Sequence, residues 1–262
     1  MAVQRASDSH KGDNGKVAII GGSLHQHGAP IFSALAAESS GVDLIYLALP
    51  KIHEIVARMQ SLNFQVHPFH GDELQKNDLG PLIEMLATVD CAVIGPGLQR
   101  TSNGLGLIRE LIESAPCPLV LDASALQEWT LDAAKGKTAV VTPHLGELER
   151  MGISPKNIGT AAKKSGVVIH VKAKIDLTAG IDGKIRKTSG GNAGLTVGGT
   201  GDALAGLICG LIAQGTPPGE ACVTASTVIK RAGTMLFHDF DNAYGTRRVI
   251  ENIPHVLRSL LQ

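Results

Sequence analysis

The chain contains 262 residues, of which 44% are hydrophobic and 18% are charged, so it has enough apolar material for a substantial core and is not a disordered chain. Its 24 basic and 24 acidic residues cancel, and only 3% of its residues are aromatic, which argues against partners such as nucleic acid or an anionic membrane. The four cysteines, at positions 91, 117, 209 and 222, have no CxxC spacing and are expected to be buried thiols rather than disulfides or zinc ligands.

The N-terminal stretch MAVQRASDSHKGDNGK has no apolar run long enough for a signal peptide. Residues 1–12 are expected to form a flexible segment within a single domain that spans residues 1–262. No stretch of the sequence reaches the roughly 20 apolar residues that a membrane span requires. We therefore expect a soluble, cytoplasmic protein without a membrane partner.

Short apolar runs alternate with helix-like stretches through the first two thirds of the chain. This alternation is typical of βαβ units and predicts a mostly parallel sheet. The expected strands are 17–20, 44–49, 92–94, 119–121, 139–141 and 167–171. The expected helices are 29–40, 52–60, 82–86, 104–114 with Asn103 as N-cap, and 155–164 with Ser154 as N-cap.

The pattern changes after residue 171. Residues 175–185, interrupted by the turn pair Asp182-Gly183, predict a β-hairpin. Helices are expected over 202–213, with Gly215 at the C-terminal cap, and then over 219–237 and 246–260. No repeat, charge block or Pro/Ser-rich linker divides the chain, which favours a single domain.

Small and polar residues follow most of the expected strands. The stretches GGSLHQHGAP, GPGLQR, DASAL, TPHLGE and KAKID each begin where an apolar run ends. In parallel sheets, ligands bind beyond the carboxyl ends of the strands. These five loops therefore predict one ligand-binding rim.

The glycine-dense stretch SGGNAGLTVGGTGDALAG leads directly into an expected helix. Glycines allow backbone N–H groups to approach a ligand closely, and free N–H groups at a helix N-terminus favour a phosphate. Asp202, beside this anion site, is predicted to be a base that deprotonates an attacking hydroxyl or a partner of magnesium. The alternative is an ordinary capping residue, although capping does not require six glycines.

The order of motifs GGS, GAP, GPG, LDASAL, TPHLGELERM and GLTVGGTGDALAG resembles the NAD(P)H-hydrate dehydratase family of the ribokinase-like superfamily. The resemblance covers about residues 10 to 240. It implies a three-layer α/β/α fold with a central, mostly parallel sheet and no lid domain. It also implies that ADP or ATP, with Mg²⁺, drives loss of water from the S form of hydrated NADH or NADPH (NADHX or NADPHX).

The resemblance also implies roles for individual residues. Ala29, Gly97 and His144 match contacts to the hydrated cofactor, and Asp202 matches the catalytic base. Mg²⁺ would be held through the nucleotide phosphates, with no direct protein ligand. The expected nucleotide contacts are Lys172, Ala173, Lys174, Ile175 and Asp176, together with Gly199, Thr200 and Gly201 at the phosphates.

Three positions depart from the family pattern. Ala173 stands where glycine usually follows the lysine, Ser124 replaces a second aspartate, and Gln99 replaces a glycine. Lys172 and Lys174 alternate along a strand-like stretch and would share one face, which suits a nucleotide or plain solvent exposure. The histidine pairs 25/27 and 67/70 are interpreted as solvated loop residues rather than metal ligands.

Two other functions remain open on the sequence alone. The same acid and anion site would serve a small-molecule kinase that phosphorylates a vitamin precursor or a sugar. A non-catalytic nucleotide-binding sensor is the other alternative, favoured by the missing acid at Ser124. By analogy we expect a homo-oligomer and a separate epimerase for the hydrated cofactor. The preference for ADP or ATP, and for NADHX or NADPHX, stays open.

Overall fold

The structure, a computed structural model, describes residues 5–260. All nine described strands belong to one sheet, in the order β3-β2-β1-β4-β5-β6-β7-β8-β9. Strands β1 to β7 run parallel, and β8 and β9 are antiparallel additions at one edge. The strands are β1 (Lys16–Ile20), β2 (Leu44–Pro50), β3 (Phe64–Phe69), β4 (Cys91–Ile94), β5 (Leu119–Leu121), β6 (Ala139–Val141), β7 (Val168–Val171), β8 (Asp176–Ala179) and β9 (Ile185–Thr188).

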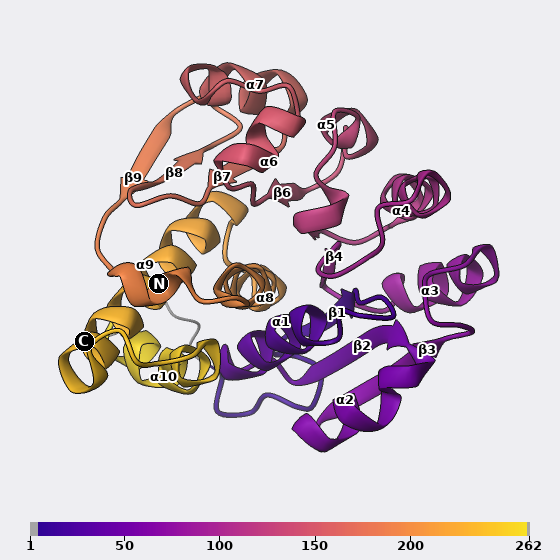
Figure 1. The fold of residues 1–262 in the computed structure, drawn as a ribbon, viewed down its shortest axis with the longest axis horizontal. Coiled ribbons are helices and arrows are strands. Elements are labelled where there is room, and N and C mark those ends of the chain that lie inside the picture. Colours follow the sequence, from indigo (N-terminus) through magenta and orange to yellow (C-terminus); the bar gives the residue numbers. More distant parts are fainter. Residues whose placement is uncertain (1–4, 261–262) are drawn as a thin grey trace.

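Helices cover both faces of this sheet (Figure 1). The α-helices are α1 (Gly28–Ser39), α2 (Glu54–Gln60), α3 (Leu79–Leu86), α4 (Ser102–Ser114), α5 (Thr130–Ala133), α6 (Leu145–Arg150), α7 (Ile158–Ser165), α8 (Thr200–Ala213), α9 (Pro218–Phe240) and α10 (Thr246–Ser259). Short 3₁₀ turns are η1 (Lys51–His53), η2 (Lys76–Asp78), η3 (Ala123–Ala125), η4 (Pro155–Asn157) and η5 (Ala193–Thr196).

Alternation along the strands divides the core into two layers. In β1, Val17 and Ile19 belong to the core layer that includes residues of α1, α8, α9 and α10, whereas Ala18 and Ile20 belong to the layer that includes residues of α3, α4 and α7. Both sets of side chains are fully buried, as expected when helices cover both faces of a parallel sheet. The predicted three-layer α/β/α fold with a mostly parallel sheet is therefore confirmed.

Most predicted elements are present, with corrected ends. The expected helix 52–60 begins as η1, and the expected helix 155–164 begins as η4, which Ser154 caps as predicted. Thr101, not Asn103, caps α4, because its side chain accepts a hydrogen bond from the Gly104 N–H. Gly215, at φ +87°, follows the last turn of α8 and donates to the Ile212 carbonyl, which confirms the predicted cap.

One strand and two α-helices are absent from the sequence prediction. Strand β3 is not among the predicted strands. It contains Pro68, which cannot donate to a strand neighbour and is tolerated because β3 is an edge strand. Helices α5 and α6 are short segments within stretches that read as loops. The predicted hairpin is present, but its second strand begins at Ile185 rather than ending there.

The remaining predictions concern the cysteines and the N-terminal segment. All four cysteines are free and buried, as predicted. No described helix is long and apolar enough to cross a membrane. Residues 1–4 of the expected flexible segment lie outside the described residues, and Gly12 of the same segment donates its N–H to Asp43 at 2.8 Å.

Helices α1 and α8 approach each other closely through glycine. A Cβ at Gly206 of α8 would lie 2.0 Å from the Ser33 carbonyl oxygen of α1. Ser33 also donates its hydroxyl to the Asp202 carbonyl at 2.9 Å. This contact couples the N-terminal turn of α8 to α1.

Replacing Gly206 by alanine should therefore destabilise the fold. Overpacking against a backbone atom typically costs about 1–3 kcal/mol, and urea denaturation would show a lower midpoint. Gly106→Ala in α4 is the matched control, since a Cβ there meets nothing within 4 Å. That control should gain up to about 1 kcal/mol from helix propensity, and an equal loss in both variants would contradict the packing argument.

Candidate active site

A cavity of about 730 Å³ opens between β7, the start of α8 and the middle of α9. Its walls come from the turn that follows β7, the glycine loop before α8 and one face of α9. It lies at the carboxyl edge of the sheet, where the sequence predicts a binding rim. Its lining residues are His144, Lys172, Ala173, Lys174, Asp176, Gly190, Gly191, Asn192, Ala193, Leu195, Thr196, Thr200, Gly201, Leu204, Ser226, Ile229 and Lys230.

The first turn of α8 presents its backbone to this cavity. Gly199, the N-cap, has φ +97°, and a Cβ there would lie 2.5 Å from the Phe32 ring. Both facts require glycine at this position. Gly199 has no side chain to cap the turn, and the Thr200 N–H makes only a long hydrogen bond of 3.5 Å to the Val197 carbonyl. The N–H groups at the positive end of the helix dipole can therefore bind an anion.

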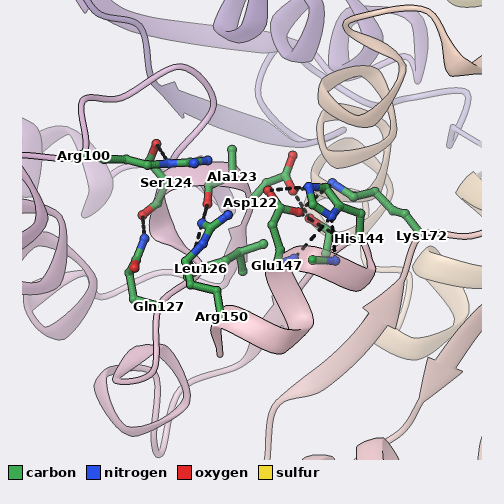
Figure 2. A network of polar contacts seen from close by, with 12 residues as sticks. Arg100, Asp122, Ala123, Ser124, Leu126, Gln127, His144, Glu147, Arg150 and Lys172 are labelled. Carbon is green, nitrogen blue, oxygen red and sulfur yellow. Dashed lines mark hydrogen bonds and ion pairs between the residues drawn. The ribbon is translucent and has the colours of Figure 1, made fainter. Parts of the chain in front are cut away.

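A buried group of charges lies beside this helix start. Lys172 Nζ donates to Asp122 Oδ1 at 2.7 Å and lies 3.8 Å from Glu147 Oε2 (Figure 2). Asp122 also accepts a hydrogen bond of 2.8 Å from the Thr142 hydroxyl. A Cβ at Gly201 would lie 3.3 Å from Lys172 Nζ. The ammonium group therefore rests directly against the first turn of α8.

His144 is the N-cap of α6. Its Nδ1 accepts hydrogen bonds from the Gly146 N–H at 3.0 Å and the Glu147 N–H at 3.3 Å, while Glu147 Oε2 accepts from the His144 N–H at 3.0 Å. This reciprocal pair is a capping box. Because Nδ1 accepts, the proton of a neutral His144 ring resides on Nε2, which can donate to a ligand in the cavity.

Burial and these charges together set the ionisation of Asp202. Burial raises the pKa of Asp202 to about 7, with further increases from Asp122 and Glu147 and an opposing decrease from Lys172. Burial lowers the pKa of Lys172, but Asp122 and Glu147 raise it by more, so this lysine stays charged. A carboxylate with a pKa near neutral pH can both accept and release a proton during a reaction.

The Glu147→Gln variant tests this charge balance. A base works when it is deprotonated, so activity should fall as the pH drops through the Asp202 pKa of about 7. Removing the negative charge of Glu147 lowers that pKa, and the acid limb of kcat/KM should move to lower pH. Glutamine retains the capping box. Glu149→Gln, an exposed position on the same helix, should leave the limb in place, whereas a shift of equal size there would contradict the assignment.

The loops that lead to the predicted substrate contacts Ala29 and Gly97 follow β1 and β4 and contact each other. The Gly22 N–H donates to the Pro96 carbonyl at 2.8 Å, and a Cβ at Gly97 would lie 3.0 Å from the Gln26 carbonyl oxygen. Ala29 lies in the first turn of α1, one turn before the Ser33 that contacts Asp202. Ala29 and Gly97 therefore lie at neighbouring strand ends rather than in the wall of the 730 Å³ cavity.

Comparison with known proteins agrees with this geometry. The family model for NAD(P)H-hydrate dehydratase matches residues 17–255. The chain belongs to the NAD(P)H-hydrate dehydratase family. The ADP-dependent (S)-NAD(P)H-hydrate dehydratase of Cenarchaeum symbiosum is 35% identical over 240 residues, which covers 87% of this chain and 83% of that protein.

Longer relatives and solved structures extend the comparison. The bifunctional NAD(P)H-hydrate repair enzyme of Methanopyrus kandleri is 33% identical over 96% of this chain, which spans 51% of that protein. The ADP/ATP-dependent NAD(P)H-hydrate dehydratase of Bacillus subtilis, co-crystallised with ATP and Mg²⁺, has the same fold. That structure gives a TM-score of 0.83 at 24% identity, covering 98% of this chain and 94% of the other.

Most of the expected nucleotide contacts of the dehydratase family come together in this chain. Lys172, Ala173, Lys174, Asp176, Thr200 and Gly201 all line the cavity, and Ile175 and Gly199 lie within the same two turns. The expectation that Lys172 and Lys174 share one face of a strand is wrong. Residues 173–175 form a bend between β7 and β8, in which Lys172 is largely buried and Lys174 is exposed.

The departures from the family pattern have local explanations. The Ala173 N–H donates to Asp176 Oδ1 at 2.8 Å, and Ala173 is not among the positive-φ residues, so the bend requires no glycine. Ser124 donates to the Leu98 carbonyl at 2.6 Å and accepts from Arg100 Nε at 3.2 Å (Figure 2). Gln99 packs against Gly104, where a Cβ would lie 2.7 Å from Gln99 Cγ.

Sequence reasoning does not single out two carboxylates of the site. Asp122 and Glu147 both affect Asp202, yet each lies in a stretch, DASAL and TPHLGE, that is predicted only as part of the rim. Their position as the acids closest to two strand ends is the signal that could have identified them. Ala123, between Asp122 and Ser124, has φ +53°, and such strain at a non-glycine residue is typical of functional sites.

Proposed function

We propose that this chain catalyses the ADP- or ATP-dependent dehydration of the S form of hydrated NADH or NADPH, which restores the intact cofactor. One observation carries the proposal: Asp202 lies in the first turn of a helix whose N-cap, Gly199, has no side chain, and Lys172 Nζ rests against the same turn. An acid beside a phosphate site repels the phosphate, so its presence there favours a catalytic role. Membership of the NAD(P)H-hydrate dehydratase family favours this reaction among those the site could perform.

In the proposed reaction, Asp202 accepts the proton of the ring hydroxyl of the hydrated nicotinamide. The hydroxyl oxygen then forms a bond to the terminal phosphorus of the nucleotide, and the bond from that phosphorus to the rest of the nucleotide breaks. Phosphate leaves with the electron pair of the C–O bond, and a proton is lost from the neighbouring ring carbon. Phosphorylation thus converts a hydroxyl, a poor leaving group, into a good one.

The residues around Asp202 would supply position and charge. The N–H groups of the first turn of α8 and the ammonium of Lys172 are placed to balance charge on the transferred phosphoryl group. Mg²⁺, when bound by the nucleotide phosphates, neutralises part of their charge. Among residues 5–260 no group of three or more His, Cys, Asp or Glu side chains could hold a metal ion. We propose that the metal is held through the nucleotide.

An assay with two products tests the function. Purified protein with NADHX, Mg²⁺ and either ADP or ATP should generate NADH absorbance and one inorganic phosphate per NADH. A stable phosphoester in place of free phosphate would indicate the alternative kinase. Nucleotide binding without turnover of any hydroxyl substrate would indicate the alternative sensor.

We also propose that the chain acts as a cytoplasmic homo-oligomer alongside a separate epimerase for the hydrated cofactor. The relative from Methanopyrus kandleri is named a bifunctional repair enzyme, and this chain spans 51% of its length. Several large apolar side chains on η1 and α2 are exposed, including Ile55 at 73% and Met59 at 78%. Such a patch suits a contact between copies, and light scattering would measure the assembly.

A further inference from the structure

Lys230, on α9, is a buried lysine that the proposed reaction does not use. It is 8% exposed, and its Nζ donates to the carbonyls of Ala173 and Lys174, both at 3.2 Å. The same Nζ lies 3.4 Å from Asp176 Oδ1. The ammonium group therefore holds the bend that forms one wall of the cavity.

The stem of the same side chain contacts the opposite wall. A Cβ at Gly191 would lie 3.4 Å from Lys230 Cγ, and a Cβ at Gly190 would lie 3.7 Å from Lys230 Cβ. Lys230 thus packs against the glycine loop while its end bonds to the bend after β7. One side chain spans both walls of the cavity.

Buried polar partners keep Lys230 in this position. Asp176 accepts hydrogen bonds from the Ser226 hydroxyl at 2.6 Å and the Ala173 N–H at 2.8 Å. His170 lies 3.9 Å from Asp176 Oδ2, but burial lowers the pKa of His170 to about 4, so this ring is neutral at pH 7. Lys230 is therefore the positive partner of Asp176 among the groups facing it.

We propose that Lys230 is a positioning residue that fixes the separation of the two walls at the width an adenine nucleotide requires. This inference rests on the proposed nucleotide role of the cavity. It also accounts for Ala173 in place of glycine, because side-chain hydrogen bonds, rather than a positive φ, shape the bend. Lys230 acts through the backbone at residues 173 and 174 and takes no part in proton or phosphoryl transfer.

The test compares Lys230→Met with wild type. Methionine retains most of the stem and removes the ammonium group. Isothermal titration with ADP and Mg²⁺ should show a Kd about tenfold higher, because without the ammonium group the bend at residues 173 and 174 is no longer held in its binding position. The KM for nucleotide should rise by the same factor, while kcat and the KM for NADHX stay near wild type. Arg231→Met, the exposed neighbour on α9, is the matched control and should change neither value.

A second variant, Lys230→Gln, provides a test if Lys230→Met does not fold. Lys230→Gln can still donate to a carbonyl and should restore part of the nucleotide affinity. An unchanged Kd for ADP in Lys230→Met, or an equal fall in kcat for both variants, would overturn the positioning role. The proposed function is tested separately. It fails if the wild-type protein binds ADP but does not convert NADHX. The comparison of Kd values between variants can still be made in that case, because it does not require turnover.

Discussion

Replacing Asp202 by asparagine is expected to reduce turnover by about 10²- to 10⁴-fold, which is the usual cost of losing a positioned general base. The amide has nearly the same shape, so the fold and the contact from Ser33 to the residue 202 carbonyl should persist. Nucleotide affinity should stay the same or increase, because a negative charge near the phosphates is removed. Steady-state rates and a titration with ADP measure the two effects separately.

The control for this variant is Asp182→Asn, since Asp182 is exposed and lies on the turn between β8 and β9. It should behave as wild type in both measurements. A near-normal rate in Asp202→Asn would remove the residue from its role as base. A lost rate together with lost nucleotide binding would instead point to a damaged site.

Replacing Lys172 by methionine is expected to have the second largest effect. Asp122, with its side chain 2% exposed, would lose its ion pair with Lys172, and removing one partner of a buried pair typically costs about 3–5 kcal/mol. Lys172 also lowers the pKa of Asp202, so its loss should move the acid limb of kcat/KM to higher pH. This shift is opposite to the one expected for Glu147→Gln.

A double variant separates the stability effect from the catalytic one. Asp122→Asn combined with Lys172→Met removes the unpaired charge and should recover most of the lost stability in urea denaturation, while the Thr142 hydroxyl can still donate to the amide oxygen. Turnover should stay low, because the ammonium near the first turn of α8 is still missing. Equal stability of the single and double variants would contradict the pairing of Asp122 with Lys172.

The sheet and its binding rim could be predicted from sequence because they depend on local patterns. Buried parallel strands such as β1, β4 and β6 are continuous apolar runs, and the loops after them collect small and polar residues. The glycine loop and Asp202 can be predicted for the same reason, since the loop and the start of α8 are adjacent in the chain. Strand β3 does not fit this pattern, because it alternates exposed residues and contains Pro68.

The charge balance around Asp202 could not be predicted in this way. Lys172 and Asp122 are 50 residues apart in the chain, and only the order of strands β5, β6 and β7 brings them together. Lys230 meets Ala173 across 57 residues for a similar reason. Burial and tertiary pairing, rather than local sequence, therefore set the pKa of Asp202 and the shape of the cavity wall.

A crystal structure with ADP and Mg²⁺ tests the central claim most directly. The account predicts the terminal phosphate at the N–H groups that begin α8, with the Asp202 carboxylate facing it and Lys172 Nζ alongside. A terminal phosphate bound elsewhere, with residue 202 facing only protein, would contradict the account.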